Sequence, residues 1–256
     1  MGSRCNLNDM DANGAKDHSS VQPSLSWREF QFQHKAQVSK HPAYPRILQM
    51  GLLDDTAFHL DVGCSTGTDL RKLAGDGWSA ERLIGVDLEQ AWIDLGYKQY
   101  RDRATCDIKF VAGDICHDDL LQPIGQLARD GSNILDKTAS DDLVHSNVRC
   151  ISVFSFFHLF DEAGQLELAR RLGSLLSNKP GSTIYGAHRG RATAGRAEKT
   201  RIGDIYCHSP SSWTSLWQER VFPESSGISV QVDVDFRDGP EDKDIDRVMV
   251  WSVTIA

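Results

Sequence analysis

A run of small residues that follows an apolar segment is the first pattern in the chain that could hold a ligand. In LDVGCSTGTDLRKLA, Asp61 closes the apolar segment, and Gly63, Ser65 and Gly67 follow at two-residue spacing. Small residues let a ligand approach the backbone, and the amide groups that enter a helix favour electronegative atoms. A purely structural turn is the alternative, because a Gly-x-Ser-x-Gly pattern alone has low specificity.

Two further acids make the pattern more specific. Asp87 lies 20 residues (87 − 67) after Gly67, at the end of a second apolar segment. From there a carboxylate can accept hydrogen bonds from ribose hydroxyls, although Asp is also a common cap of a following helix. Asp114 closes a third apolar segment. We expect Asp61, Asp87 and Asp114 to meet at the carboxyl edge of a parallel sheet, where α/β proteins bind ligands.

The charge of Asp61 favours one kind of nucleoside ligand. A dinucleotide would place its pyrophosphate at the first turn, where this carboxylate would repel it. S-adenosylmethionine has no phosphate, and its ammonium can pair with Asp61 while its diol meets Asp87. We therefore expect S-adenosylmethionine as the cofactor. A nicotinamide-dependent oxidoreductase is a weaker hypothesis that the strand and helix pattern allows.

Alternating strands and helices must position these residues. Strand-like segments occur at 58–62, 82–87, 107–114, 150–156 and 182–188, with helical patterns between them, including one near 91–103 and one near 118–130. This alternation implies a parallel sheet covered on both faces. Later, residues 228–236 alternate apolar and polar side chains, which predicts an antiparallel strand near an edge, and 247–256 is an apolar strand that could pair with it.

Composition sets limits on partners and location. Against 36 acidic residues stand 28 basic ones, a net charge of −8, and no long basic run offers a face for nucleic acid. No apolar stretch approaches the roughly 20 residues of a membrane helix. The six cysteines contain no C-x-x-C pair, and with no signal peptide visible we expect a cytoplasmic protein. Neither zinc spacing nor an EF-hand pattern is present, so we expect no metal.

Several segments together resemble the class I S-adenosylmethionine-dependent methyltransferases, and more narrowly the small fungal enzymes that methylate meroterpenoid acids and related polyketide products. They are LDVGCSTGTDLRKLAGDG, LIGVDL, LGYKQYRDR, IKFVAGDI, FSFFHLFD and HSPSSW, and they spread over roughly residues 40 to 256. The resemblance implies an α/β fold, with a Rossmann-like seven-stranded mixed sheet, helices on both faces and an antiparallel last strand. The implied cofactor-binding residues are Asp61, Gly63, Cys64, Ser65, Gly67, Asp87, Leu88, Asp114, Ile115, Phe154 and Ser155.

The candidate catalytic residues lie in the second half of the chain. His158 in FSFFHLF could orient or deprotonate an acceptor, or cap the turn after the fourth strand. Arg189, expected after the fifth strand, could hold an acid by a bidentate pair, although a solvated Arg is common. His208, before SPSSW, is more often a loop or cap residue, and Trp213 and Trp217 are more often core than pocket walls.

We expect a disordered arm at 1–25, followed by a single domain over 26–256. Within that domain, we expect residues 26–55 to help cover the cofactor. The two prolines at 42 and 45 are expected to break the cover into short helices. We expect an O-methyltransferase that acts on a small apolar natural-product acid or hydroxyl. A methyltransferase-like cyclase or isomerase that transfers no methyl group is the alternative.

Overall fold

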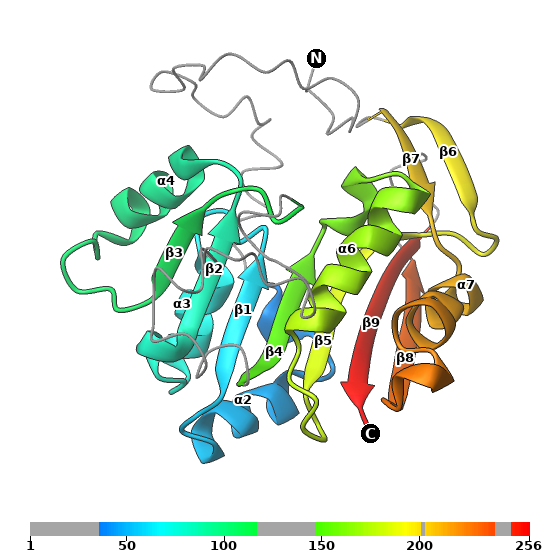
Figure 1. Cartoon of the computed structure of the whole chain (residues 1–256). Coiled ribbons are helices and arrows are strands. Elements are labelled where there is room, and N and C mark those ends of the chain that lie inside the picture. The colour runs from blue at the N-terminus through cyan, green and yellow to red at the C-terminus, as the bar shows by residue number, and fades with distance from the viewer. Residues whose placement is uncertain (1–35, 117–146, 201–202, 239–246) are drawn as a thin grey trace, which may run out of the picture.

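A seven-stranded sheet in the order β3-β2-β1-β4-β5-β9-β8 forms the centre of the molecule (Figure 1). The computed structural model describes residues 36–116, 147–200, 203–238 and 247–256. β1 to β5 are parallel to one another, whereas β9 is antiparallel to both β5 and β8. This confirms the predicted α/β, Rossmann-like mixed sheet with an antiparallel last strand. The strands are β1 Phe58–Val62, β2 Leu83–Asp87, β3 Lys109–Ala112, β4 Val148–Phe154, β5 Thr183–Gly190, β8 Val230–Asp238 and β9 Arg247–Ile255.

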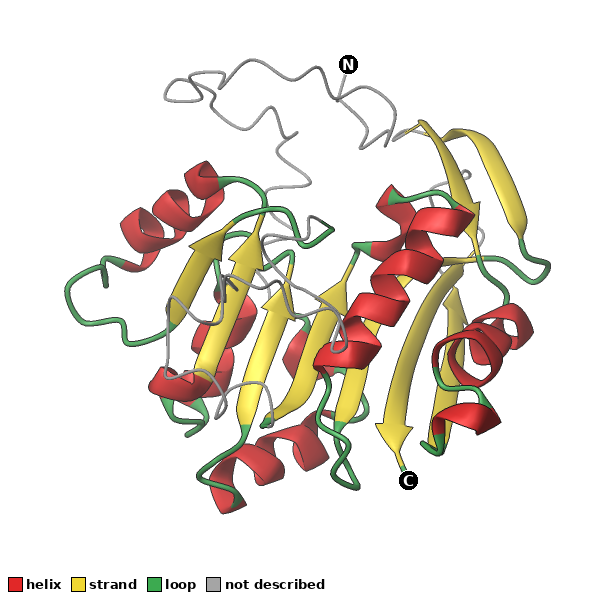
Figure 2. Ribbon diagram, viewed as in Figure 1, coloured by secondary structure: helices red, strands yellow, loops and turns green. Residues whose placement is uncertain are grey.

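Helices cover the sheet, with α6 in front in the view of Figure 2 and α2 near the lower ends of the strands. The α-helices are α2 Tyr44–Leu53, α3 Thr68–Gly75, α4 Gln90–Tyr100, α6 Glu162–Leu175 and α7 Pro210–Ser215. Short turns of other helix types are η1 Val38–Lys40, η2 Ala80–Arg82, η3 Phe157–Leu159, η4 Leu216–Val221 and η5 Glu224–Ser226. The predicted arm 1–25, the helix at 118–130 and the start of the cover segment lie outside the described residues.

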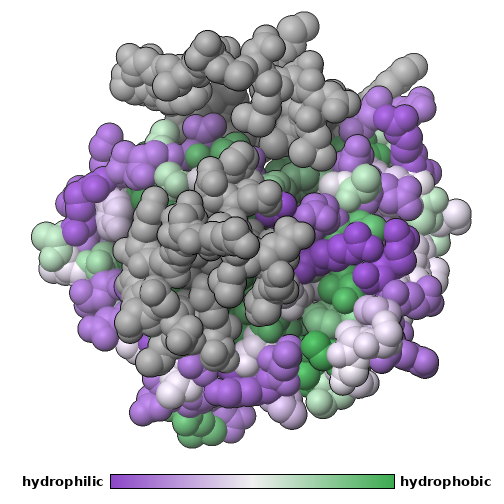
Figure 3. All heavy atoms as spheres, in the orientation of Figure 1, coloured by the Kyte–Doolittle hydropathy of each residue, from purple (hydrophilic) through white to green (hydrophobic). Residues whose placement is uncertain are grey.

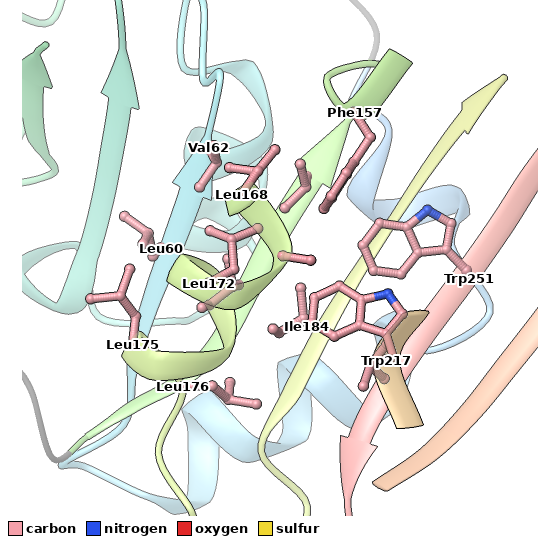
Figure 4. Packing of buried hydrophobic residues seen from close by; sticks show 14 of the residues in the cluster. Leu60, Val62, Phe157, Leu168, Leu172, Leu175, Leu176, Ile184, Trp217 and Trp251 are labelled. Carbon is pink, nitrogen blue, oxygen red and sulfur yellow. The ribbon is translucent and has the colours of Figure 1, made fainter. Parts of the chain in front are cut away.

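Successive side chains of a strand point to opposite sides of the sheet, and in β1, β2, β4 and β5 most residues on both sides are buried, whereas the edge strand β3 is half-buried. On one face Leu60 and Val62 of β1 pack with the leucines of α6, as Figure 4 shows. The other face packs against α2 and α3 through residues such as Ile47 and Leu70. Seen from the α6 side, hydrophobic residues occupy only separate small areas of the described surface (Figure 3), because α6 turns its leucines toward the sheet.

Aromatic rings fill the part of the core between α7, η4 and β9. The ring of Trp251 lies 4.8 Å from that of Trp213 and 6.1 Å from that of Trp217, centroid to centroid. Phe157 of η3 adds a perpendicular contact to Trp213 at 4.9 Å. All four rings are buried. The prediction that Trp213 and Trp217 serve core packing is therefore confirmed.

The two last strands differ in burial because of their places in the sheet. β8 is at the edge and pairs with β9, and its side chains alternate between half-buried and exposed, as in Val232 and Asp233. β9 lies between β5 and β8, and Met249 through Val253 are all buried. The predicted edge strand is confirmed.

A two-stranded sheet made of β6 Gly195–Thr200 and β7 Gly203–Cys207 was not predicted from the sequence. Its first strand, GRAEKT, is charged and lacks an apolar alternation that would indicate a strand. Gln165 Nε2 of α6 donates to the carbonyl oxygen of Tyr206 at 2.9 Å and joins this hairpin to the main domain. β5 is also longer than predicted, so Arg189 lies within the strand rather than after it.

The described part of the cover segment contains η1 and α2. Pro42 separates the two, as expected, but the prediction that Pro45 also breaks the helix is wrong. Pro45 stands in the first turn of α2, where a helix needs no backbone N–H donor. Arg46 of α2 donates to the hydroxyls of Thr183 and Thr254, at the start of β5 and the end of β9. Of the described cover residues, Gln37 and Val38, before α2, bond to Asp69 at the start of α3, near the carboxyl end of β1.

Candidate functional site

The turn after β1 has the unusual backbone that its sequence suggests. Gly63 and Gly67 have φ angles of 71° and 68°, and Ser65 has a φ of 50°, which side-chain-bearing residues rarely adopt. The N–H groups of Gly63 and Cys64 both donate to the carbonyl oxygen of Val86, at 2.9 and 3.0 Å. These bonds hold the turn against β2, next to the start of α3.

The aromatic rings of Phe156 and Phe110 pack directly against Gly63 and Gly67. A Cβ atom on Gly63 would lie 2.8 Å from the ring of Phe156, and one on Gly67 would lie 2.4 Å from the ring of Phe110. On the other side of the turn, Gly96 of α4 lies so close that a Cβ there would be 2.3 Å from the carbonyl oxygen of Thr66. The glycines are therefore required by packing, which holds the turn in one conformation.

Asp61 is a carboxylate enclosed in the sheet. It lies opposite Ser152 in the β1 and β4 register, and the hydroxyl of Ser152 donates to its Oδ1 at 2.6 Å. Burial raises the pKa of Asp61 well above its usual range, and the nearby charges of Asp69 and Asp87 raise it further. A positively charged ligand group beside Asp61 would act in the opposite direction and stabilise the ionised form.

Asp69 is a second, half-buried acid that the sequence analysis did not single out. Its Oδ1 accepts from the N–H groups of Gln37 and Val38, at 2.6 and 3.1 Å. Burial raises the pKa of Asp69 to about 6. These two bonds fasten the start of η1 to the first turn of α3, beside Asp61. Its place in DLRKLA, directly after the glycine turn, was the available signal.

Asp87 holds two parts of the site with its two oxygens. Oδ2 accepts from the N–H of Ser65 at 2.8 Å, and Oδ1 accepts from the N–H of Glu89 at 3.0 Å, just before α4. Burial raises the pKa of Asp87. Asp87 is not the cap of α4, whose N-cap is Glu89. Each carboxylate oxygen can accept more than one hydrogen bond, so a role toward ribose hydroxyls stays a prediction.

The residues beyond β2 and β3 have different exposures. Leu88 is 62% exposed, whereas Ile115 is buried in the core. Asp114 lies two residues beyond the end of β3, and its Oδ1 accepts from the N–H of Cys116 at 2.8 Å. Leu88 therefore offers an apolar surface to a ligand, and the predicted contact of Ile115 would have to come from its backbone.

Arg71 is a further residue that the sequence analysis missed. Its guanidinium pairs with both carboxylate oxygens of Asp102, at 2.7 and 3.0 Å, and donates to the carbonyl oxygen of Thr66 at 2.8 Å. It also lies over the ring of Tyr100, 4.4 Å from the centroid. Arg71 thereby ties the glycine turn to the end of α4.

The end of β4 forms the second wall of the site. Phe154 is the last residue of the strand, and Ser155 follows with a φ of 52°. The N–H of Ser155 donates to the carbonyl oxygen of Ala187 at 2.7 Å, and Ser155 is exposed. Phe156 then packs on Gly63, so the turns after β1 and β4 are in direct contact.

The predicted catalytic histidines are buried on this side of the site. Burial lowers the pKa of His158 to about 4, and the charge of Arg189 acts in the same direction. Burial also lowers the pKa of His208 to about 4. His208 Nδ1 lies 2.9 Å from the hydroxyl of Ser212, and His208 immediately precedes Ser209, the N-cap of α7. His208 is therefore not itself the cap of α7, and its catalytic role stays a prediction.

His188 of β5 lies between these two. Burial lowers its pKa well below the usual range, and the neighbouring His158 and His208 disfavour its charged form further. The indole N–H of Trp251 donates to its Nδ1 at 2.8 Å. The structure therefore gathers His158, His188 and His208, with Arg189 nearby, at the ends of β4 and β5.

Within the described part of the chain, no group of three His, Cys, Asp or Glu side chains is arranged to hold a metal ion. None of the helices in the same ranges is both long and apolar enough to cross a membrane.

Comparison with known proteins agrees with this geometry. Residues 60–126 match the model of the methyltransferase domain family. The chain is 34% identical over 218 residues to the O-methyltransferase phiE of a fungal species, covering 84% of this chain and 64% of phiE. It is 31% identical over 202 residues to the asnovolin E/chermesin D methyltransferase nvfJ of Aspergillus novofumigatus, covering 76% of this chain and 63% of nvfJ.

The chain belongs to the class I methyltransferases.

The fold is also similar to that of solved methyltransferase structures. Magnesium protoporphyrin IX methyltransferase of Synechocystis, solved with bound S-adenosylmethionine, aligns with a TM-score of 0.52 at 10% identity, over 93% of this chain and 86% of that one. At this identity the likeness concerns the fold alone. The chain spans somewhat less than two thirds of the length of phiE and nvfJ.

Proposed function

We propose that this methyltransferase domain uses S-adenosylmethionine to methylate an oxygen of a small, apolar natural product. The observation that carries the proposal is the enclosed carboxylate of Asp61, held by Ser152 directly before the glycine turn. Among the described residues, the charged side chains that act on the pKa of this carboxylate are the acids Asp69 and Asp87, and the ammonium of the donor would supply the missing positive charge. A pyrophosphate at the same place would be repelled, which argues against a nicotinamide dinucleotide.

The residues of the site match the chemical groups of this donor. Asp61 would pair with the ammonium, and Asp87 would accept from the ribose hydroxyls. The N–H groups of Gly63, Cys64, Ser65 and Gly67 already donate within the protein, so the 63–67 turn would serve the donor by its close backbone approach. Leu88, exposed beside Asp87, would cover part of the adenine. When bound, S-adenosylmethionine supplies a methyl group on a positively charged sulfur. The protein's part is to hold the acceptor oxygen in line with that methyl group.

An acid is the preferred acceptor. A carboxylate is ionised near neutral pH and needs no base, whereas a hydroxyl would need one. His158, whose pKa of about 4 keeps it neutral at pH 7, could accept a hydroxyl proton or orient an acid. The names of phiE and nvfJ, an O-methyltransferase and a methyltransferase of named natural products, support a small-molecule acceptor and favour methyl transfer over a cyclase or isomerase activity.

Two measurements test the proposal. Calorimetry with S-adenosylhomocysteine should show binding in the micromolar range, and incubation with methyl-labelled donor and a panel of aromatic and terpenoid acids should yield a labelled ester. Intact-mass analysis of the product then identifies the added methyl group. Binding of the donor without transfer to any acid or hydroxyl of the panel would contradict the O-methyltransferase proposal, and no binding of the donor would contradict the cofactor.

A further inference from the structure

Four enclosed polar atoms without a hydrogen-bond partner among the described residues gather at the ends of β4 and β5. They are His158 Nδ1, His188 Nε2, His208 Nε2 and Trp213 Nε1. The ring of Trp213 lies 4.6 Å from that of His188 and 5.3 Å from that of His208, centroid to centroid. An enclosed polar group that lacks a partner destabilises the folded state. Several such groups in one place indicate a function beyond packing.

Trp251 fixes the position of the proton on His188. An indole N–H can only donate, and it donates to His188 Nδ1 at 2.8 Å. Nδ1 is therefore the acceptor, and the proton of the neutral ring is on Nε2. Because burial lowers the pKa of His188 well below its usual range, the ring stays neutral. His188 Nε2 is thus an N–H donor whose direction is set by β9.

The sheet places this donor beside the predicted methyl position. Phe154 pairs with Ala187 in the β4 and β5 register, and the N–H of Ser155 donates to the carbonyl oxygen of Ala187. His188 is the next residue of β5. The resemblance to methyltransferases implies that Phe154 and Ser155 lie beside the transferred methyl group, so the donor is on the neighbouring strand, one residue further on.

We propose that His188 Nε2, with His158 and His208 beside it, binds a carboxylate oxygen of the methyl acceptor and so determines its acid specificity. This inference rests on the proposed function and adds the residues that recognise the acceptor. An N–H donor needs an oxygen acceptor, and Arg189, whose charge acts on His158, makes an anionic oxygen favourable. The side of η3 that faces solvent is the nearest exposed surface to the three rings, because Leu159, the residue after His158, is 58% exposed.

Nuclear magnetic resonance of the full chain, labelled with nitrogen-15 in histidine and saturated with S-adenosylhomocysteine, tests the inference. The free protein should show His188 with the proton on Nε2. Millimolar benzoate should shift the His188 Nε2 resonance, whereas benzylamine, of the same size but with no oxygen, should not. A proton on Nδ1, or a Nε2 resonance that benzoate leaves unchanged, would overturn the proposal and leave an internal water only as the partner of this atom.

Matched variants separate recognition from folding. His188→Phe keeps a buried ring but removes the donor, and it should weaken benzoate binding about tenfold while S-adenosylhomocysteine binding stays within about twofold. His59→Phe, which removes a buried histidine bonded to Tyr185, is the control and should bind benzoate normally. If His188→Phe does not fold, Trp251→Phe provides the test, because loss of the indole N–H should allow the proton of His188 onto Nδ1.

The outcomes distinguish the two proposals. Benzoate affinity in His188→Phe equal to that of the unaltered chain would refute the assignment of the acceptor subsite and leave the methyltransferase proposal intact. Loss of S-adenosylhomocysteine binding or of labelled methyl transfer in the unaltered chain would refute the proposed function instead. The resonance experiment measures acid binding directly, so it gives its answer whether or not methyl transfer is found.

Discussion

The two halves of the carboxyl edge carry opposite kinds of polar group. At the ends of β1 and β2 and the start of α3, buried Asp61 and half-buried Asp69 and Asp87 each accept hydrogen bonds from protein N–H or O–H groups. At the ends of β4 and β5, His158 and His188 are buried and neutral, and the ring of His188 contacts that of Trp213. The first half suits a positively charged ligand, and the second suits an oxygen that accepts hydrogen bonds. A cationic methyl donor would therefore bind at the acidic half, and an acidic methyl acceptor at the histidine half.

The largest effect should come from the acidic half. Asp61→Asn removes the negative charge that would pair with the donor ammonium, and loss of one partner of a buried charge pair costs about 2–5 kcal/mol. S-adenosylhomocysteine should therefore bind at least about 30-fold more weakly in calorimetry. Asp76→Asn, which changes a surface acid paired with Lys72, is the control. Unchanged affinity in Asp61→Asn would remove the electrostatic basis of the comparison.

A smaller effect is expected from the histidine half. His158→Phe should lower kcat about tenfold on an acid, because only orientation is lost, and about 100-fold or more on a hydroxyl acceptor, because a base is lost. Donor affinity should stay within about twofold, since His158 lies on η3 rather than at the glycine turn. Steady-state kinetics on matched acid and alcohol acceptors would measure both values. A selective loss of donor affinity would show that the two halves are not separate.

Arg71→Lys should weaken the frame of the acidic half. Lysine cannot replace the bidentate pair with Asp102 together with the bond to the Thr66 carbonyl, so we expect a loss of about 1–2 kcal/mol in the free energy of unfolding by urea. Arg103→Lys alters a pair with Asp94 whose arginine is 62% exposed, and it should change stability by about 0.5 kcal/mol or less. Equal effects in the two variants would contradict the role given to Arg71.

A pH dependence of stability is expected from Asp69. Its pKa in the folded protein is about 6, above the usual 3.8, because it is buried. Between these values the folded state binds more protons than the unfolded state, so stability should fall as pH rises from about 4 to 6. Asp69→Asn keeps an oxygen acceptor but does not titrate, so its melting temperature should fall less over this interval. Parallel melting curves for both proteins would exclude this contribution.

The sequence predicted the acidic half better than the histidine half, for a physical reason. Asp61 and Asp87 stand at strand ends and flank a local turn, so spacing along the chain was sufficient to place them. The bond between Trp251 and His188 joins residues 63 positions apart and depends on the antiparallel register of β5 and β9. No local pattern encodes that register. Arg71 was missed for the same reason, because its partner Asp102 lies beyond α4.

Some of the fold was also outside the reach of sequence patterns. Strict apolar alternation located β8, and continuous apolar runs located β1, β4 and β9. The β6 and β7 hairpin has no such signal, because both strands are short and β6 is charged. The hairpin is held beside α6 by Gln165, whose side chain donates to the backbone carbonyl of Tyr206. A bond to backbone does not depend on the type of residue at position 206, so the sequence gives no sign of it.

The interior place of β9 has a consequence for how the chain matures on the ribosome. Within the described residues β8 pairs with β9 and with no other strand of the sheet, although it is synthesised first. Until β9 emerges, β5 has an open edge and β8 has nowhere to dock. A premature stop codon just before residue 247 would therefore remove two strands from the sheet rather than one. The unpaired edges of β5 and β8 would then be free to pair with other chains and promote aggregation.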